Sequence, residues 1–224
     1  MCGRFTLASD PKTLTETFPD FEAPTELSPR YNIAPTQDVA VIANNGENKI
    51  EYFHWGLIPF WAKDAKIGNR MINARGETLG EKPAFRTAYK RRRCLILTDG
   101  FYEWRKMPGS RLKVPMYIRM ESGKPFAFAG LWEVWHPPEG DDPVLSCTII
   151  TCAPNELMQQ IHHRMPVILQ PEAYELWLTT TEQPPDALND LLKPYPTEEM
   201  TAYSVSRLVN SPKNDSPDCV VPAQ

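Results

Sequence analysis

The sequence lacks several features that would assign the protein to a class at once. Its 224 residues contain no stretch near the roughly 20 apolar residues that a membrane span needs. The N-terminus also lacks the basic region and apolar core of a secretory signal peptide. The net charge of −4 excludes a globally basic protein that coats nucleic acid. We therefore expect a cytoplasmic protein with no membrane partner, in which any DNA contact comes from a local basic groove.

Cysteine is sparse, and its spacing points to no framework. The five cysteines are an odd number and include no Cys-x-x-Cys pair. In the reducing cytoplasm this pattern argues against structural disulfides and against a structural zinc site, so we expect free thiols. They are Cys2, Cys94, Cys147, Cys152 and Cys219.

Proline is abundant instead, with 23 residues in the chain. Because proline is excluded from helix interiors and central strands, we expect many short elements joined by long connections. Runs rich in branched and aromatic residues predict strands within 49–58, 93–104, 114–120, 125–135 and 145–153. Short helices are predicted within 9–18, 82–92, 155–163, 171–178 and 184–192, and the proline-punctuated stretch 24–37 reads as an irregular connection.

The predicted strands cluster and do not alternate with long helices. This order favours an α+β fold with a largely antiparallel sheet, a barrel-like core and several short helices. The sequence shows no internal repeat and no low-complexity boundary, so a single domain over residues 1–224 is expected.

Polar residues interrupt two otherwise apolar stretches. Asn73 and Arg75 stand among small residues in "GNRMINARGET", where the ordinary role of an asparagine is to form a turn. Asp99 and Glu103 adjoin a strongly apolar strand in "LILTDGFYEWR". A buried carboxylate costs several kcal/mol unless it is paired or protonated, so Glu103 either has a function or simply faces solvent.

Two of the four histidines in the chain, His162 and His163, are adjacent in "QQIHHRMPVIL". Imidazole titrates near neutral pH and can move protons in both directions. The alternative is a capping or merely exposed histidine. The sequence alone leaves both open.

Aromatic and basic residues alternate in "FHWGLIPFWAK". Trp55, Phe60 and Trp61 belong either to the core or to a surface on which bases stack. The cationic run "YKRRR" at 89–93 is typical of a solvated helix face and is also a candidate phosphate contact.

Cys2 directly follows the initiator methionine. If Met1 is removed, residue 2 carries an α-amine and a thiol on adjacent carbons, a pair that no internal residue offers. The alternative is that Cys2 has no reactive role and is a small apolar residue that begins a strand.

Seven blocks in order resemble the SOS-response-associated peptidase (SRAP) family, from residue 1 to about 218. They are "MCGRF", "RYNIAP", "WGLIPFW", "INARGET", "DGFYEW", "HHRMPVIL" and "VNSPKNDSP". The resemblance implies a protein that shields abasic sites in single-stranded DNA by covalent attachment, acting as a monomer and joining the nucleoid when on DNA. It implies a crosslinking role for Cys2, catalytic roles for Asn73, Glu103 and His162, and DNA contacts at Arg4, Arg75, Trp55 and Trp61.

The chemistry of an N-terminal cysteine suits this activity. An α-amine has a pKa near 7.7–8.0 against about 10.4 for lysine, so far more of it is neutral and able to form a Schiff base with an aldehyde. The adjacent thiol then closes a five-membered thiazolidine, for which no metal or organic cofactor is required. Two alternatives stay open, a thiol peptidase that uses Cys2 for acyl transfer and a non-covalent binder of modified single-stranded DNA.

Overall fold

The computed structural model describes residues 2–110, 112–138, 140 and 142–223. The strands are β1 (Phe5–Leu7), β2 (Arg30–Ile33), β3 (Asp38–Ala43), β4 (Ile50–Trp55), β5 (Asn73–Arg75), β6 (Arg93–Thr98), β7 (Gly100–Lys106), β8 (Lys113–Met120), β9 (Phe126–Trp135), β10 (Val144–Cys152), β11 (Met165–Pro166) and β12 (Met200–Ser204). The α-helices are α1 (Pro11–Thr17), α2 (Arg86–Arg91), α3 (Glu156–Gln159), α4 (Tyr174–Leu178) and α5 (Pro185–Asn189). Short 3₁₀ turns are η1 (Ala65–Arg70), η2 (Gly76–Thr78), η3 (Pro171–Ala173), η4 (Thr197–Glu199), η5 (Arg207–Asn210) and η6 (Pro217–Cys219).

The larger sheet closes on itself. Its order is β11-β10-β4-β3-β6-β9, and an additional pairing between β9 and β10 closes the ring, with β11 as a further strand on β10. Strand β6 is buried along its whole length, as an apolar strand enclosed on both sides must be. The α+β class, the mostly antiparallel pairing and the barrel-like core expected from the sequence are confirmed.

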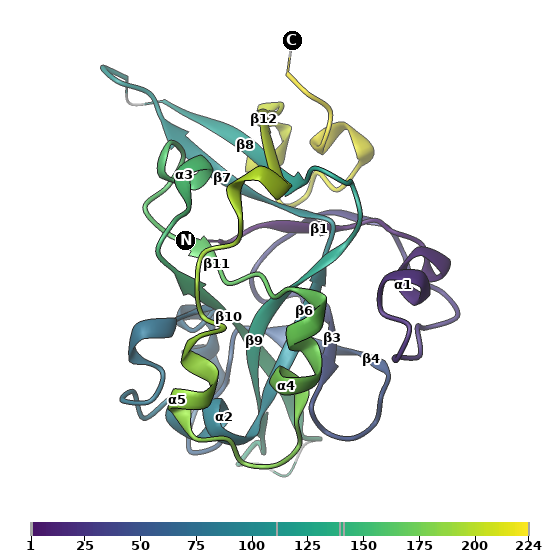
Figure 1. Cartoon of the computed structure of the whole chain (residues 1–224), viewed down its shortest axis with the longest axis vertical. Helices are drawn as coiled ribbons and strands as arrows, with labels where there is room; N and C mark the ends of the chain where they lie inside the picture. Colours follow the sequence, from purple (N-terminus) through teal and green to yellow (C-terminus); the bar gives the residue numbers. More distant parts are fainter. Residues whose placement is uncertain (1, 111, 139, 141, 224) are drawn as a thin grey trace.

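A second sheet, in the order β12-β8-β7-β1-β2, lies across one end of this barrel (Figure 1). Its centre is the long β7–β8 pair, whose register runs from Gly100 opposite Arg119 to Lys106 opposite Lys113. Strand β1, which follows Cys2, pairs with β7 and β2, and Asn73 at the start of β5 donates a hydrogen bond to the carbonyl oxygen of Cys2. Segments from distant parts of the sequence therefore meet around residue 2.

Two glycines allow the segment after β4 to pack closely on η1. Gly56 has a φ of +143°, and a Cβ built there lies 2.7 Å from the carbonyl oxygen of Gly68. A larger residue at either position would push the two backbones apart. This close approach joins the "WGLIPFW" block to the segment that leads into β5.

Several expectations need correction. The stretch 24–37 is not wholly irregular, because Arg30–Ile33 forms β2 against β1. The cations of "YKRRR" are engaged in the fold: Arg91 pairs with Glu182, Arg92 pairs with Glu133, and buried Arg93 donates to the carbonyl oxygens of Trp177 and Thr179. Arg92 and Arg93 therefore stabilise the end of the barrel around α2, whereas Lys90 and Arg91 are exposed and share Glu182 as a partner.

In the part of the chain that the structure describes, no helix is long and apolar enough to cross a membrane.

Candidate active site

The segment that contains Cys2 is held along β7. The N–H of Tyr102 donates to the carbonyl oxygen of Arg4 at 2.9 Å, and Phe5 pairs with Phe101. Continuing this antiparallel register towards the N-terminus places Gly3 opposite Glu103, so Cys2 lies one position beyond it. The strand that the sequence predicts around Glu103 therefore positions the N-terminal segment as well.

Cys2 is almost completely buried, with 1% of its surface exposed. The side-chain amide of Asn73 donates to the carbonyl oxygen of Cys2 at 2.7 Å. Burial raises the pKa of the Cys2 thiol far above its usual value, and the nearby Glu103 carboxylate raises it further. The residue is therefore a thiol, not a thiolate, at neutral pH.

Asn73 reaches Cys2 because β5 lies along β10. Asn73 pairs with Ile149 and Arg75 with Thr151 in a short parallel ladder. The amide oxygen Oδ1 of Asn73 is buried and accepts no hydrogen bond from any residue that the structure describes. An unsatisfied buried acceptor next to a reactive residue is a ready partner for a hydroxyl or an amine of a bound molecule.

Glu103 is 4% exposed, so it does not face solvent. Its Oε1 lies 4.0 Å from Nδ1 of His162. Burial lowers the pKa of His162, while the charge of Glu103 opposes this shift and raises it. Nδ1 also lies 3.1 Å from the carbonyl oxygen of Arg164 and 3.2 Å from its backbone nitrogen, so the turn that follows holds the ring through this atom.

The turn after His162 is fixed by Arg164. Its guanidinium forms two hydrogen bonds with Glu77, at 2.6 and 2.9 Å, and one with the carbonyl oxygen of Thr151 at 2.6 Å. Arg164 holds the pKa of Glu77 below its usual value. Sequence reasoning missed both residues as part of the site, although they lie within the "INARGET" and "HHRMPVIL" blocks.

A second network joins two further blocks. The side chain of buried Asn32 donates to the carbonyl oxygens of Ser211 and Asn214, at 2.9 and 2.6 Å. Asp215 accepts from the backbone N–H of Asn32 at 3.0 Å and pairs with Arg30 at 2.6 Å. These contacts explain why "RYNIAP" and "VNSPKNDSP" carry polar residues that do not line the reactive cluster.

Arg4 belongs to this second network. Its Nη1 donates to Oδ1 of Asn32 at 2.8 Å and to the carbonyl oxygen of Val209 at 2.7 Å. Its guanidinium carbon lies 5.8 Å from the ring centre of Trp104. Arg4 is therefore tied to the scaffold beneath the N-terminal segment.

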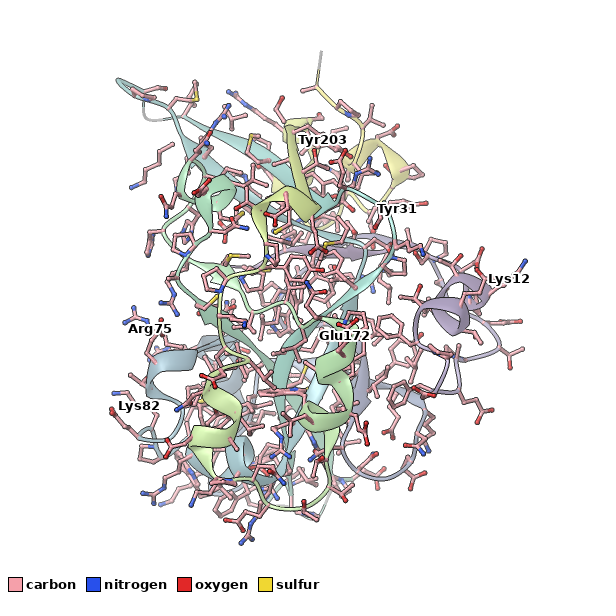
Figure 2. The ribbon with its side chains drawn as sticks, in the orientation of Figure 1. Lys12, Tyr31, Arg75, Lys82, Glu172 and Tyr203 are labelled. Atoms are coloured by element: carbon pink, nitrogen blue, oxygen red, sulfur yellow. The ribbon has the colours of Figure 1, made fainter. Side chains whose placement is uncertain are left out.

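The three other residues expected to contact DNA differ in exposure. Arg75 is exposed at the end of β5 and lies at the periphery of the molecule (Figure 2). Trp61 is also accessible, with 48% of its surface exposed. Trp55 is not: it is fully buried, its ring contacts Phe5, and its Nε1 donates to the carbonyl oxygen of Ile72. The expectation of a stacking surface at Trp55 is thus corrected, because neither face of its ring is open to a base.

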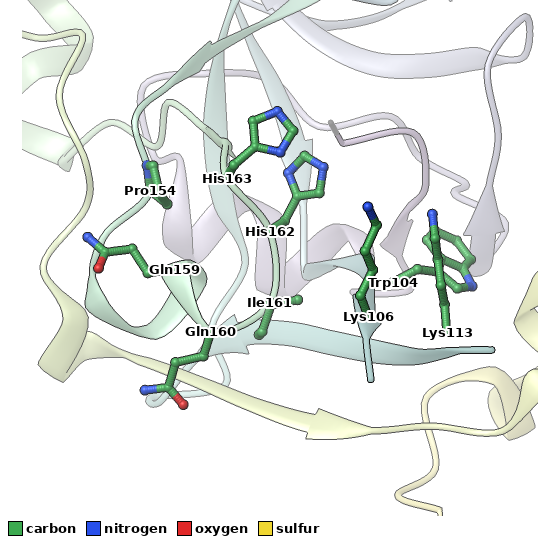
Figure 3. A pocket seen from close by; sticks show the side chains of 9 residues that line it. All are labelled: Trp104, Lys106, Lys113, Pro154, Gln159, Gln160, Ile161, His162 and His163. Carbon is green, nitrogen blue, oxygen red and sulfur yellow. The ribbon is translucent and has the colours of Figure 1, made fainter. Parts of the chain in front are cut away.

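A cavity of about 750 Å³ adjoins this cluster. Figure 3 shows the rings of His162 and His163 side by side, with Trp104, Lys106 and Lys113 across from them. The two imidazole centres are 4.3 Å apart. His162 therefore borders both the Cys2 cluster and an open cavity. Gln159, Gln160, Pro154 and Ile161 complete the lining.

The structure thus brings together the four residues expected to be catalytic: Cys2, Asn73, Glu103 and His162. Met1, whose removal the expected chemistry requires, lies outside the described residues. Among the residues that the structure does describe, no group of three or more His, Cys, Asp or Glu side chains is arranged to hold a metal ion.

Comparison with known proteins identifies the family of the chain. The model of the SOS response associated peptidase (SRAP) family matches residues 1–212. The chain belongs to the SRAP family. This SRAP chain is 51% identical over 223 residues to the abasic site processing protein YoqW of Bacillus subtilis, covering 98% of this chain and 99% of that one. It is 30% identical to the abasic site processing protein HMCES of Pongo abelii, covering 99% of this chain and 76% of the relative.

Among solved structures, the SRAP chain is similar to a Bacteroides thetaiotaomicron protein with a TM-score of 0.88 and 28% identity, over all of both chains. A Bordetella bronchiseptica protein matches with a TM-score of 0.78 and 26% identity, over 92% of this chain and 100% of the other.

Proposed function

We propose that this protein processes abasic sites in DNA by attaching itself covalently to them through Cys2. The relatives named above are abasic site processing proteins and match the chain over nearly its whole length. The observation that carries the proposal is the gathering of Asn73, Glu103 and His162 around the residue that follows Met1.

In the proposed reaction, loss of Met1 frees the α-amine of Cys2. The amine adds to the open-chain aldehyde of an abasic sugar and one water leaves, which gives a Schiff base. The thiol sulfur then bonds to the same carbon while its proton passes to the nitrogen. The product is a thiazolidine, and the whole sequence releases one water.

The surrounding residues suit these proton transfers. Burial lowers the pKa of His162, so the ring is neutral at neutral pH and can accept a proton from the attacking amine before returning one to the leaving water. Glu103 holds the resulting imidazolium, since its carboxylate lies 4.0 Å from the ring. Asn73 fixes the Cys2 carbonyl and offers its unsatisfied Oδ1 to the sugar.

The placement of both nucleophiles on one residue favours ring closure, because the second step is then intramolecular. We propose single-stranded DNA as the substrate, bound by one copy of the protein, with Arg75 and Trp61 along the strand.

The test is the intact mass of the protein after incubation with a single-stranded oligonucleotide that contains one abasic site. The expected mass is that of the chain without Met1 plus the oligonucleotide minus one water, stable without borohydride. Cys2→Ala should remove the stable adduct and leave at most a Schiff base that borohydride traps.

A protein that has lost Met1 and yet forms no adduct would overturn the proposal. Hydrolysis of peptides that depends on Cys2 would then indicate the acyl-transfer activity. Unchanged DNA binding by Cys2→Ala without any adduct in the wild type would indicate a non-covalent binder.

A further inference from the structure

The cavity next to His162 contains two lysines that face the same space. Lys106 ends β7, Lys113 begins β8, and the two residues are direct partners in the antiparallel register. Both line the cavity of about 750 Å³ that His162 and His163 border on the other side. In Figure 3 the two lysine side chains run in the same direction, next to the ring of Trp104.

This placement of charge is unfavourable for the protein alone. Like charges directly opposite each other on neighbouring strands destabilise the pair. Neither lysine forms an ion pair with any residue in the described part of the chain, and the side chains that line the cavity include no carboxylate. In a chain of net charge −4, a cavity with two unpaired ammonium groups stands out as a site for an anion.

We propose that this cavity binds a backbone phosphate of the nucleotide that flanks the abasic site, with Lys106 and Lys113 as its contacts. The inference rests on the proposed function, because that function brings a DNA strand to His162. His162 lies in the reactive cluster and in the cavity wall, so a strand whose abasic sugar reaches Cys2 has its next phosphate close to the lysines. Lysine binds a phosphate as a point charge, so the contact carries no preference for base sequence.

Binding of an intact single-stranded oligonucleotide without an abasic site tests the lysines separately from the chemistry. The full-length Lys106→Gln/Lys113→Gln protein is compared with wild type and with Lys124→Gln/Lys193→Gln, which removes the same charge from exposed positions outside the cavity. The slope of log affinity against log salt should fall by about 1 in the cavity variant. Affinity at low salt should fall about tenfold, and the control should stay close to wild type.

Adduct formation tests the position of the phosphate. Four substrates are used: an oligonucleotide with nucleotides on both sides of the abasic site, the two oligonucleotides that retain nucleotides on one side only, and free 2-deoxyribose. The Lys106→Gln/Lys113→Gln protein should react more slowly than wild type with the two-sided oligonucleotide. It should react at the wild-type rate with one of the one-sided oligonucleotides and with 2-deoxyribose.

The failures are distinguishable. A salt slope and affinity equal to wild type would overturn the phosphate site even if every adduct forms. A defect that persists with both one-sided oligonucleotides or with 2-deoxyribose would also overturn it, since the lysines would not then be acting on one flanking nucleotide. If wild type forms no adduct with any substrate, the proposed covalent function fails. The salt slopes then still show whether the two lysines of the cavity contact a phosphate.

Discussion

Nδ1 of His162 lies 4.0 Å from Oε1 of Glu103, and both side chains are largely withdrawn from solvent. At this separation the carboxylate stabilises a protonated ring, whereas burial disfavours it. The same carboxylate disfavours the thiolate of Cys2. One charge therefore influences both the proton-transfer group and the nucleophile.

Glu103→Gln is expected to lower the pKa of His162 and also the pKa of the Cys2 thiol. The two shifts share a direction because the carboxylate favours the imidazolium and repels the thiolate. NMR titration of the His162 ring and the pH profile of Cys2 alkylation measure them. Glu47→Gln, an exposed position elsewhere, serves as the control. A His162 pKa that rises in Glu103→Gln would contradict the assigned coupling.

Asn73→Ala should slow adduct formation more than it weakens DNA binding. The substitution removes the donor to the Cys2 carbonyl and the free Oδ1, so Cys2 loses its orientation. Misplacement of a reacting group by about 1 Å costs on the order of 100-fold in rate. Single-turnover rates at saturating oligonucleotide measure this loss, and urea unfolding reports the accompanying cost of about 1–2 kcal/mol for the lost hydrogen bond.

Asn73→Asp tests whether the hydrogen bond donated by the Asn73 amide, and not the packing of the side chain, orients Cys2. It keeps the shape but presents a carboxylate oxygen to the Cys2 carbonyl, and two acceptors repel each other. We expect a rate no higher than that of Asn73→Ala. Recovery of wild-type rate in the aspartate variant would show that the amide donor is dispensable.

The local blocks of sequence predict the reactive cluster but not the contacts that hold it. Cys2, Asn73, Glu103 and His162 are recognisable because each is a chemically distinctive residue in an apolar or small-residue frame. The pairs Asn32–Asp215 and Glu77–Arg164 are 183 and 87 residues apart in the chain. No local periodicity encodes such partners, since only the closed barrel and the second sheet bring them together.

Burial within one block was equally hard to predict. Trp55 and Trp61 are six positions apart in the same aromatic stretch, yet one is fully buried and the other half exposed. The chain turns at Gly56, whose φ of +143° ends the strand geometry on which an alternation argument depends. The composition of this stretch indicates that an aromatic ring is exposed, but it does not show whether the exposed ring is Trp55 or Trp61.

Removal of the Glu77 carboxylate should destabilise the protein in a pH-dependent way. Arg164 lowers the pKa of Glu77 in the folded state, so the pair stabilises the fold above the unfolded pKa of about 4.3, and this contribution is lost as pH falls through the lower folded value. Because the Glu77 side chain is 53% exposed, Glu77→Gln should lower the free energy of unfolding at pH 7 by no more than about 1 kcal/mol.

Urea unfolding of wild type and Glu77→Gln at pH 7, 5 and 4 measures this contribution. The difference between the two proteins should shrink as the pH is lowered. Glu47→Gln removes a carboxylate that contacts only an exposed lysine among the described residues, so it should show a smaller difference at pH 7. A Glu77 difference that grows towards pH 4 would contradict the sign of the linkage.

The two tryptophans provide a matched pair for the last prediction. Trp55→Ala should lower the free energy of unfolding by about 3–5 kcal/mol, because it opens a cavity in the core and removes one of the two hydrogen bonds that the Ile72 carbonyl accepts. Trp61→Ala should change it by no more than about 0.5 kcal/mol, as expected for an exposed position.

Trp61→Ala should instead weaken binding of single-stranded DNA by about 1–3 kcal/mol, the usual value of a stacked base. Fluorescence anisotropy with an unmodified oligonucleotide measures the binding, and Trp55→Phe, which keeps most of the ring, provides a folded core variant for the same assay. If Trp61→Ala and Trp55→Phe both bind as tightly as wild type, then the exposed ring of Trp61 is not in the path of the strand.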